Sequence, residues 1–142
     1  MLYFDIDGVI RNLQKSLKID LENWNDFNEF HYDKIKNDPK RHLENAPYYE
    51  NMRKIINSYD QKYFITCSSE RFKDYTENFL KRIFNNFLVI YVENPESKLS
   101  YLGSDDYLVD DYPFYRDKRV ILVERKYNKD YVKNYEIVWR LN

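Results

Sequence analysis

The chain has 142 residues, with 23 basic and 24 acidic side chains and a formal net charge of -1. This length favours one domain with a substantial core, because two complete domains would each be very small. The balanced charge excludes a broad basic surface, so we expect neither extended nucleic acid nor an anionic membrane as a partner. No apolar run approaches the roughly 18 residues of a membrane span.

Cysteine usage and the first residues bear on the compartment. The only cysteine, Cys67, cannot form an internal disulfide. An acidic residue already stands at position 5, which is too early for the apolar stretch of a secretory signal. We therefore expect a cytoplasmic protein.

Six short apolar runs, rich in β-branched and aromatic residues, predict buried strands. They cover 2–4, 63–65, 87–92, 107–109, 120–123 and 137–139. Helical periodicity covers 48–58 and 70–84, the second behind the candidate caps Ser68 and Ser69. This alternation predicts an α/β, Rossmann-like fold, with a mainly parallel sheet and helices on both faces. Ligands of such a sheet gather outside the carboxyl ends of its strands.

The segment from about 13 to 46 interrupts the alternation and predicts a small, mostly helical insertion. Because it leaves directly after the first strand, we expect it to form a cap above the carboxyl ends of the strands. It carries the aromatic residues Trp24, Phe27, Phe30 and Tyr32. Their spacing favours the core of the insertion over a stacking wall for a ligand. His31 and His42 lack the spacing of metal ligands, and we expect them at the surface.

Two carboxylates, Asp5 and Asp7, end the first predicted strand, and Gly8 follows them. A turn at Gly8 would let both carboxylates address one small ligand, because glycine accepts unusual backbone angles. Two negative groups so close require a cation. Mg²⁺ suits them, since it prefers oxygen ligands and commonly joins carboxylates to a substrate phosphate. The alternative is an ordinary turn after a strand.

A second pair of acids, Asp110 and Asp111, follows the apolar run 107–109. In a parallel sheet the ends of this strand and of the first strand can converge. Asp105 and Asp106 precede the same run, so we expect them at the opposite edge as solvated turn residues. The two acidic strand ends together predict one metal site.

With Thr66 and Lys98, these acids resemble the four motifs of the haloacid dehalogenase superfamily of phosphatases, which occur here in order. The motifs are Asp-Ile-Asp-Gly-Val at 5–9, Tyr-Phe-Ile-Thr at 63–66, Lys98, and Leu-Val-Asp-Asp at 108–111. The chain is most similar to the 5'(3')-deoxyribonucleotidases, which share the Asp-Gly-Val opening and a lysine before the paired acids. Cys67-Ser68 stands where that family has Ser-Pro, and Tyr112 where it has an arginine. The resemblance implies one domain over 1–142, with a cap insertion at about 13–46.

The resemblance also implies a Mg²⁺-dependent phosphomonoester hydrolase. It assigns Asp5 as the nucleophile that becomes an aspartyl phosphate, and Asp7 as the acid and base. Asp5, the backbone carbonyl of Asp7, and Asp110 would hold the metal. Asp111 would support them, either by orienting a water or by pairing with Lys98.

Four residues are expected around the substrate phosphate: Thr66, Cys67, Ser68 and Lys98. Thr66 would donate its hydroxyl to a phosphoryl oxygen, and Lys98 would neutralise charge. The alternatives are helix capping for Thr66 and Ser68 and a solvated surface position for Lys98. Nothing cationic beside Cys67 in the sequence suggests a reactive thiol, so we expect a small inert side chain.

The substrate that best fits the resemblance is a small phosphorylated molecule, namely a (deoxy)nucleoside monophosphate. Two alternatives remain open. One is a phosphatase acting on the 3'-phosphate of nucleic-acid ends, and the other is a binding module that keeps the fold without turnover.

Overall fold

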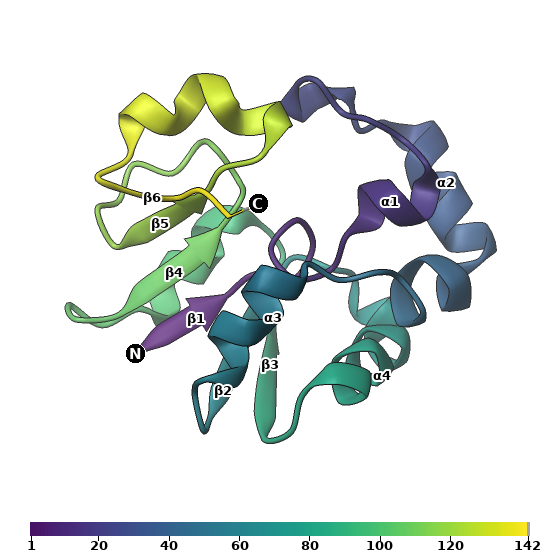
Figure 1. Cartoon of the computed structure of the whole chain (residues 1–142), viewed down its shortest axis with the longest axis horizontal. Coiled ribbons are helices and arrows are strands. Elements are labelled where there is room, and N and C mark those ends of the chain that lie inside the picture. The colour runs from purple at the N-terminus through teal and green to yellow at the C-terminus, as the bar shows by residue number, and fades with distance from the viewer. Residues whose placement is uncertain (142) are drawn as a thin grey trace.

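The computed structural model describes residues 1–141, which form a β-sheet with helices around it (Figure 1). The strands are β1 (Leu2–Phe4), β2 (Lys62–Thr66), β3 (Phe87–Tyr91), β4 (Tyr107–Asp110), β5 (Val120–Val123) and β6 (Ile137–Trp139). Each coincides with a predicted apolar run, and their ends differ from the prediction by at most one residue. All neighbouring strands pair in parallel, so the predicted α/β fold with a parallel sheet is confirmed.

The order of the strands creates a natural place for a site. They lie in the order β3-β2-β1-β4-β5-β6. The chain therefore moves outward from β1 to β3 and then returns to the other side of β1 to begin β4. The segments after β1 and β4 leave in different directions, and ligands of open parallel sheets bind at such a switch point.

Two of the helices were predicted from periodicity. The α-helices are α1 (Leu13–Leu17), α2 (Glu29–Asn37), α3 (Glu50–Asn57) and α4 (Lys73–Ile83), and η2 (Lys40–Glu44) is a π-helix. The 3₁₀ helices are η1 (Trp24–Asp26), η3 (Glu70–Phe72), η4 (Pro95–Tyr101) and η5 (Lys126–Asn134). α3 and α4 lie within the predicted helical stretches 48–58 and 70–84. Within residues 1–141, no helix is long and apolar enough to cross a bilayer.

The two faces of the sheet are covered by different kinds of helix. On one face, Met52 of α3 and Phe79 of α4 pack against Phe4 and its neighbours. On the other face, Leu102 and Tyr115 pack beside η4. Helices on both faces were predicted, but α3 and α4 share one face and the second is covered by a 3₁₀ helix.

The insertion after β1 is mostly helical, as predicted, and comprises α1, η1, α2 and η2. Figure 1 shows α1 and α2 as a separate lobe beside the sheet. Leu17, Ile35 and Leu43 form a small core of this lobe together with Phe72. The expected surface position of His42 is wrong. Its ring is buried, and its Nδ1 lies 2.7 Å from Oγ of Ser16 in a hydrogen bond between α1 and η2.

Candidate active site

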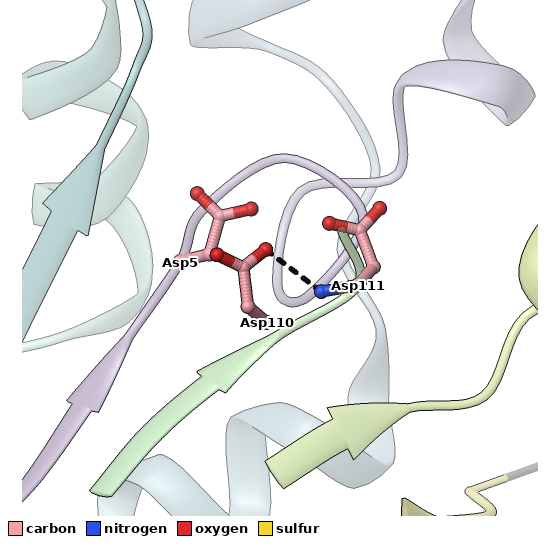
Figure 2. Close-up of side chains that lie close together, drawn as sticks. All are labelled: Asp5, Asp110 and Asp111. Atoms are coloured by element: carbon pink, nitrogen blue, oxygen red, sulfur yellow. Dashed lines mark hydrogen bonds between the residues drawn. The ribbon is translucent and has the colours of Figure 1, made fainter. Parts of the chain in front are cut away.

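The alternation of side chains along the strands brings three carboxylates together. Tyr3 and Leu108 pack on the face that η4 covers, so Asp5 and Asp110, two residues further along, turn to the same side. The carboxylates of Asp5, Asp110 and Asp111 offer oxygens within 4.8 Å of one another, and all three residues are buried (Figure 2). The predicted convergence of the two acidic strand ends is confirmed.

Lys98 of η4 reaches this cluster from the face of the sheet that η4 covers. Its Nζ donates to Oδ1 of Asp5 at 3.0 Å and to Oδ2 of Asp110 at 2.8 Å. The residue is only 2% exposed, so a solvated surface position is ruled out. Burial alone would lower the pKa of Lys98, but Asp110 and Asp5 raise it above its ordinary value. Lys98 therefore stays charged between the two acids.

Asp110 is the most firmly held of the three acids. Its Oδ2 accepts a hydrogen bond from the Tyr115 hydroxyl at 2.7 Å. Its Oδ1 accepts from the backbone N–H of Asp111 at 2.8 Å, the bond dashed in Figure 2, and from that of Tyr112 at 3.1 Å. Burial acts to raise the pKa of Asp110, but Lys98 and Tyr115 outweigh it and lower the pKa. Asp110 is thus a carboxylate at neutral pH.

Asp111 is held by residues of η5. The Tyr127 hydroxyl donates to its carboxylate, and the Asn128 side-chain amide donates to its backbone carbonyl at 2.8 Å. Lys98 pairs with Asp5 and Asp110, and the predicted alternative of an Asp111–Lys98 pair is not observed. Burial and the adjacent Asp110 raise the pKa of Asp111 to about 7.

The cluster fits a divalent cation. Asp5, Asp110 and Asp111 supply carboxylate oxygens, and Lys98 is the one cationic group paired with them among the described residues. Burial, and after it the negative charge of Asp110, raise the pKa of Asp5 well above its ordinary value. Hard oxygen donors and uncompensated charge are what Mg²⁺ requires.

The turn after β1 gives Asp7 a different environment. Gly8 has a positive φ of 83°, and a Cβ placed on it would lie 1.9 Å from Oδ2 of Asp111, so the turn requires glycine. The Asp7 carboxylate points to Arg11, whose Nε donates to Oδ1 at 2.5 Å and whose Nη2 donates to Oδ2 at 3.0 Å. Its side chain stands outside the group of three carboxylates, so its predicted role toward metal rests on the backbone carbonyl alone.

Thr66 ends β2 beside the acids and is buried. Its Oγ1 accepts a hydrogen bond from the backbone N–H of Ser68 at 3.0 Å, which closes a local turn rather than a helix cap. Ser69 caps η3 instead, accepting from the backbone N–H of Arg71 at 3.3 Å. Although Cys67 is exposed, partial burial raises its pKa to about 11, so the thiol stays protonated at neutral pH.

All of the predicted site residues line one cavity of about 330 Å³ between the sheet and the insertion. The sheet side contributes Asp5, Asp7, Thr66, Cys67, Ser68, Lys98, Asp110 and Asp111. From the insertion, Trp24, Phe27 and Tyr32 face it. Phe30 is 65% exposed and does not line it. Of the four aromatic residues expected in the core of the insertion, only Phe27 packs against that core, so the expectation is wrong for the other three. A neighbouring cavity of about 370 Å³ shares Trp24, Phe27, Asp7 and Asp111 with the first.

Three residues that hold the acids do not emerge from the sequence: Arg11, Tyr115 and Tyr127. Each contacts one of the acids directly. With 15 tyrosines and 23 basic residues in the chain, residue type alone does not select them. The spacing of four residues between Asp7 and Arg11 is the only signal, and it is common on protein surfaces.

A comparison with protein-family models finds no match to this chain, and neither does a comparison with curated proteins. What the site can do therefore follows from its own side chains. A cavity with three convergent carboxylates, a buried lysine and a hydroxyl at a strand end can bind a cation together with an anionic group. Asp7, next to this group but paired separately, can exchange a proton with a bound molecule.

Proposed function

We propose that the chain is a Mg²⁺-dependent phosphomonoester hydrolase of the haloacid dehalogenase type, with Asp5 as its nucleophile. The observation that supports this best is the gathering of Asp5, Asp110 and Asp111 around buried Lys98. Buried like charges are costly unless they are neutralised, so their concentration at the switch point of the sheet points to chemistry rather than to stability.

Asp5, Asp110, Asp111 and the backbone carbonyl of Asp7 would hold the metal. When bound, Mg²⁺ supplies positive charge that offsets the repulsion between the Asp5 carboxylate and an incoming phosphate. Lys98 adds positive charge at the same carboxylates, because its Nζ contacts both Asp5 and Asp110.

In the first step, an oxygen of Asp5 attacks phosphorus and the bond from phosphorus to the ester oxygen breaks. Asp7 gives its proton to the departing oxygen, so that an alcohol and an aspartyl phosphate result. Thr66 lies at the end of β2 beside the acids, where its hydroxyl can donate to a phosphoryl oxygen as charge develops.

In the second step, a water attacks the phosphorus of the aspartyl phosphate. Asp7 takes one proton of that water while the bond between phosphorus and Asp5 breaks. Inorganic phosphate leaves, and the Asp5 carboxylate and protonated Asp7 are restored for the next cycle.

A (deoxy)nucleoside monophosphate is the substrate we propose. The rings of Trp24, Phe27 and Tyr32 line the cavity opposite the acids, and aromatic surfaces of this kind suit a planar base. The net charge of -1 argues against a long polyanion as the main substrate.

A phosphate-release screen with and without Mg²⁺ tests this proposal. Nucleotides, sugar phosphates and 3'-phosphorylated oligonucleotides are compared in the wild-type chain and in Asp5→Asn. We expect Mg²⁺-dependent release from nucleotides, lowered by more than about 10³-fold in Asp5→Asn because the nucleophile is lost.

Asp105→Asn is the matched control, because Asp105 is exposed and precedes β4 at the opposite end from the site. It should retain wild-type activity. If no substrate loses phosphate in the presence of Mg²⁺, or if Asp5→Asn is as active as the wild type, the proposed function is wrong. If the wild type releases phosphate faster from 3'-phosphorylated oligonucleotides than from nucleotides, its substrate is the phosphorylated end of a nucleic acid.

A further inference from the structure

Arg11 is a charged side chain that the fold buries completely. Its exposed fraction is 0%, and Asp7 is the only carboxylate within the described part of the chain that pairs with it. The pair is bidentate, with Nε and Nη2 each donating to a different oxygen of Asp7. A guanidinium that forks onto a carboxylate fixes the plane of that carboxylate as well as its distance.

The rest of the Arg11 side chain is also fixed. Its Nη1 donates to Oγ1 of Thr76 in α4 at 3.1 Å and to the backbone carbonyl of Leu43 in η2 at 3.4 Å. Its guanidinium lies over the ring of Phe79, 5.3 Å from the centroid. Arg11 therefore ties the orientation of Asp7 to α4 on one side and to the insertion on the other.

The backbone brings the two partners together within one short loop. The backbone N–H of Gly8 donates to the carbonyl of Arg11 at 3.0 Å, and that of Arg11 donates to the carbonyl of Ile6 at 2.9 Å. From outside, Arg125 donates to the Gly8 carbonyl at 2.8 Å without contacting the Asp7 carboxylate. Two arginines thus support the same loop, but only Arg11 holds the carboxylate.

Asp7 keeps access to bound molecules while it is paired. Its side chain is 30% exposed, and it lines both cavities beside the acidic cluster. A carboxylate that must exchange a proton at one atom of a substrate gains rate from a fixed orientation, because misplacement by about 1 Å can cost on the order of 10²-fold.

We infer that Arg11 is a positioning residue, which fixes the plane of the Asp7 carboxyl group so that a proton on a lone pair that Arg11 does not use points to the departing oxygen. This inference rests on the proposed function. Arg11 itself would not contact the substrate, since it lines neither cavity.

Substrates with leaving groups of different basicity can reveal whether Arg11 orients Asp7 for proton transfer. The leaving group of an alkyl phosphate is a strongly basic alkoxide, which needs a proton to depart. The leaving group of p-nitrophenyl phosphate is p-nitrophenolate, which departs without one. Because kcat/KM reports only the steps up to release of the alcohol, it isolates proton transfer to the departing oxygen. Loss of Asp7 orientation must therefore lower kcat/KM more for the alkyl phosphate than for p-nitrophenyl phosphate.

The experiment compares both substrates, with Mg²⁺, in wild type, Arg11→Lys and Arg125→Lys. Arg11→Lys keeps the positive charge but loses the bidentate contact with Asp7. We expect kcat/KM to fall by a factor at least about tenfold larger for the alkyl phosphate than for p-nitrophenyl phosphate, within the roughly 10²–10⁴-fold that acid catalysis supplies. In an Asp7→Asn background, Arg11→Lys should add no further difference between the substrates. Arg125→Lys, the matched control, should affect both substrates equally.

Equal losses on the two substrates in Arg11→Lys would overturn the inference and leave Arg11 a structural role only. If Arg11→Lys does not fold, Thr76→Val decides, because it removes the hydrogen bond that fixes Nη1 of Arg11 and so loosens the guanidinium that orients Asp7. It should show a smaller difference in the same direction, and no difference would overturn the inference. Failure of the wild type on both substrates and on every substrate of the phosphate-release screen would instead refute the proposed function, and this inference with it.

Discussion

The carboxyl edge of the sheet and the insertion face each other across one cavity, but they are built differently. At the sheet edge Asp5, Lys98 and Asp110 are buried, and each is held by a short hydrogen bond or ion pair. In the insertion, the core is small. Trp24, which is half-buried, and Tyr32, which is 40% exposed, face the cavity.

Under the proposed function, this difference would separate the catalytic groups from the groups that select the substrate. Groups that must keep a fixed geometry during a reaction lie on strands and in buried networks. Side chains that meet a variable part of a ligand tolerate a less rigid setting. We therefore expect changes at the sheet edge to remove activity or stability, and changes in the insertion to alter which substrate is preferred.

The largest effect is expected from Lys98→Met. It removes the cation between Asp5 and Asp110 and leaves buried carboxylates without their partner. We expect the free energy of unfolding to fall by about 3–5 kcal/mol and phosphate release to be lost. Urea unfolding measures the first and a phosphate assay the second.

Lys126→Met is the control for that change. Lys126 also pairs with two acids, Asp20 and Glu22, but at the exposed surface. It should change stability little, because solvent screens such pairs. Similar destabilisation by both variants would contradict the special role of the buried lysine.

Gly8→Ala is expected to have the next largest effect. A Cβ at this positive φ would collide with the carboxylate of Asp111, which accepts a hydrogen bond from the Tyr127 hydroxyl. Backbone strain of about 1–3 kcal/mol, with displacement of Asp111, should lower both the melting temperature and Mg²⁺-dependent activity. Calorimetry with and without Mg²⁺ measures both the strain and any loss of metal binding.

Gly103→Ala is the matched glycine change. A Cβ at Gly103 would lie 3.1 Å from a carboxylate oxygen of Asp106, at the edge opposite the site. That side chain is partly exposed and can shift, so activity should remain. A loss of activity in Gly103→Ala as great as that in Gly8→Ala would show that the turn after β1 has no special importance.

The smallest effect is expected from Trp24→Ala, which tests whether the insertion helps to select the substrate. Trp24 lines both cavities but is not part of the small core of the insertion. Loss of one aromatic contact, worth about 0.5–1.5 kcal/mol, should lower kcat/KM for a nucleotide by up to about tenfold. Activity toward a small phosphate ester should stay unchanged.

Phe30→Ala should leave both activities unchanged, since Phe30 is 65% exposed and lines neither cavity. Equal effects of Trp24→Ala on large and small substrates would contradict a role of the insertion in selecting the substrate.

The sheet edge could be predicted from the sequence because its signals are local. Short apolar runs mark parallel strands, and the ends of parallel strands meet at one edge, which brings Asp5 near Asp110 and Asp111. Lys98 could be placed at the site only through the resemblance, because composition does not distinguish it from other lysines. The roles of these residues in catalysis stay predictions.

The partners of the acids could not be predicted, because they depend on packing between distant segments. Tyr115 reaches Asp110 from the loop after β4, and Tyr127 reaches Asp111 from η5. His42 was expected at the surface because nothing in its neighbourhood indicates the contact with Ser16, 26 residues away. Which aromatic side chains of the insertion face the cavity likewise depends on how its helices pack.

Trapping the covalent intermediate tests the nucleophilic role of Asp5 most directly. The wild-type chain is mixed with substrate and Mg²⁺, quenched in acid during the first turnover, and mapped by mass spectrometry. We expect a phosphoryl group on Asp5, and none in Asp5→Asn. Turnover in which the phosphoryl group lies on another residue, or on no residue at any time during the first turnover, would contradict the account.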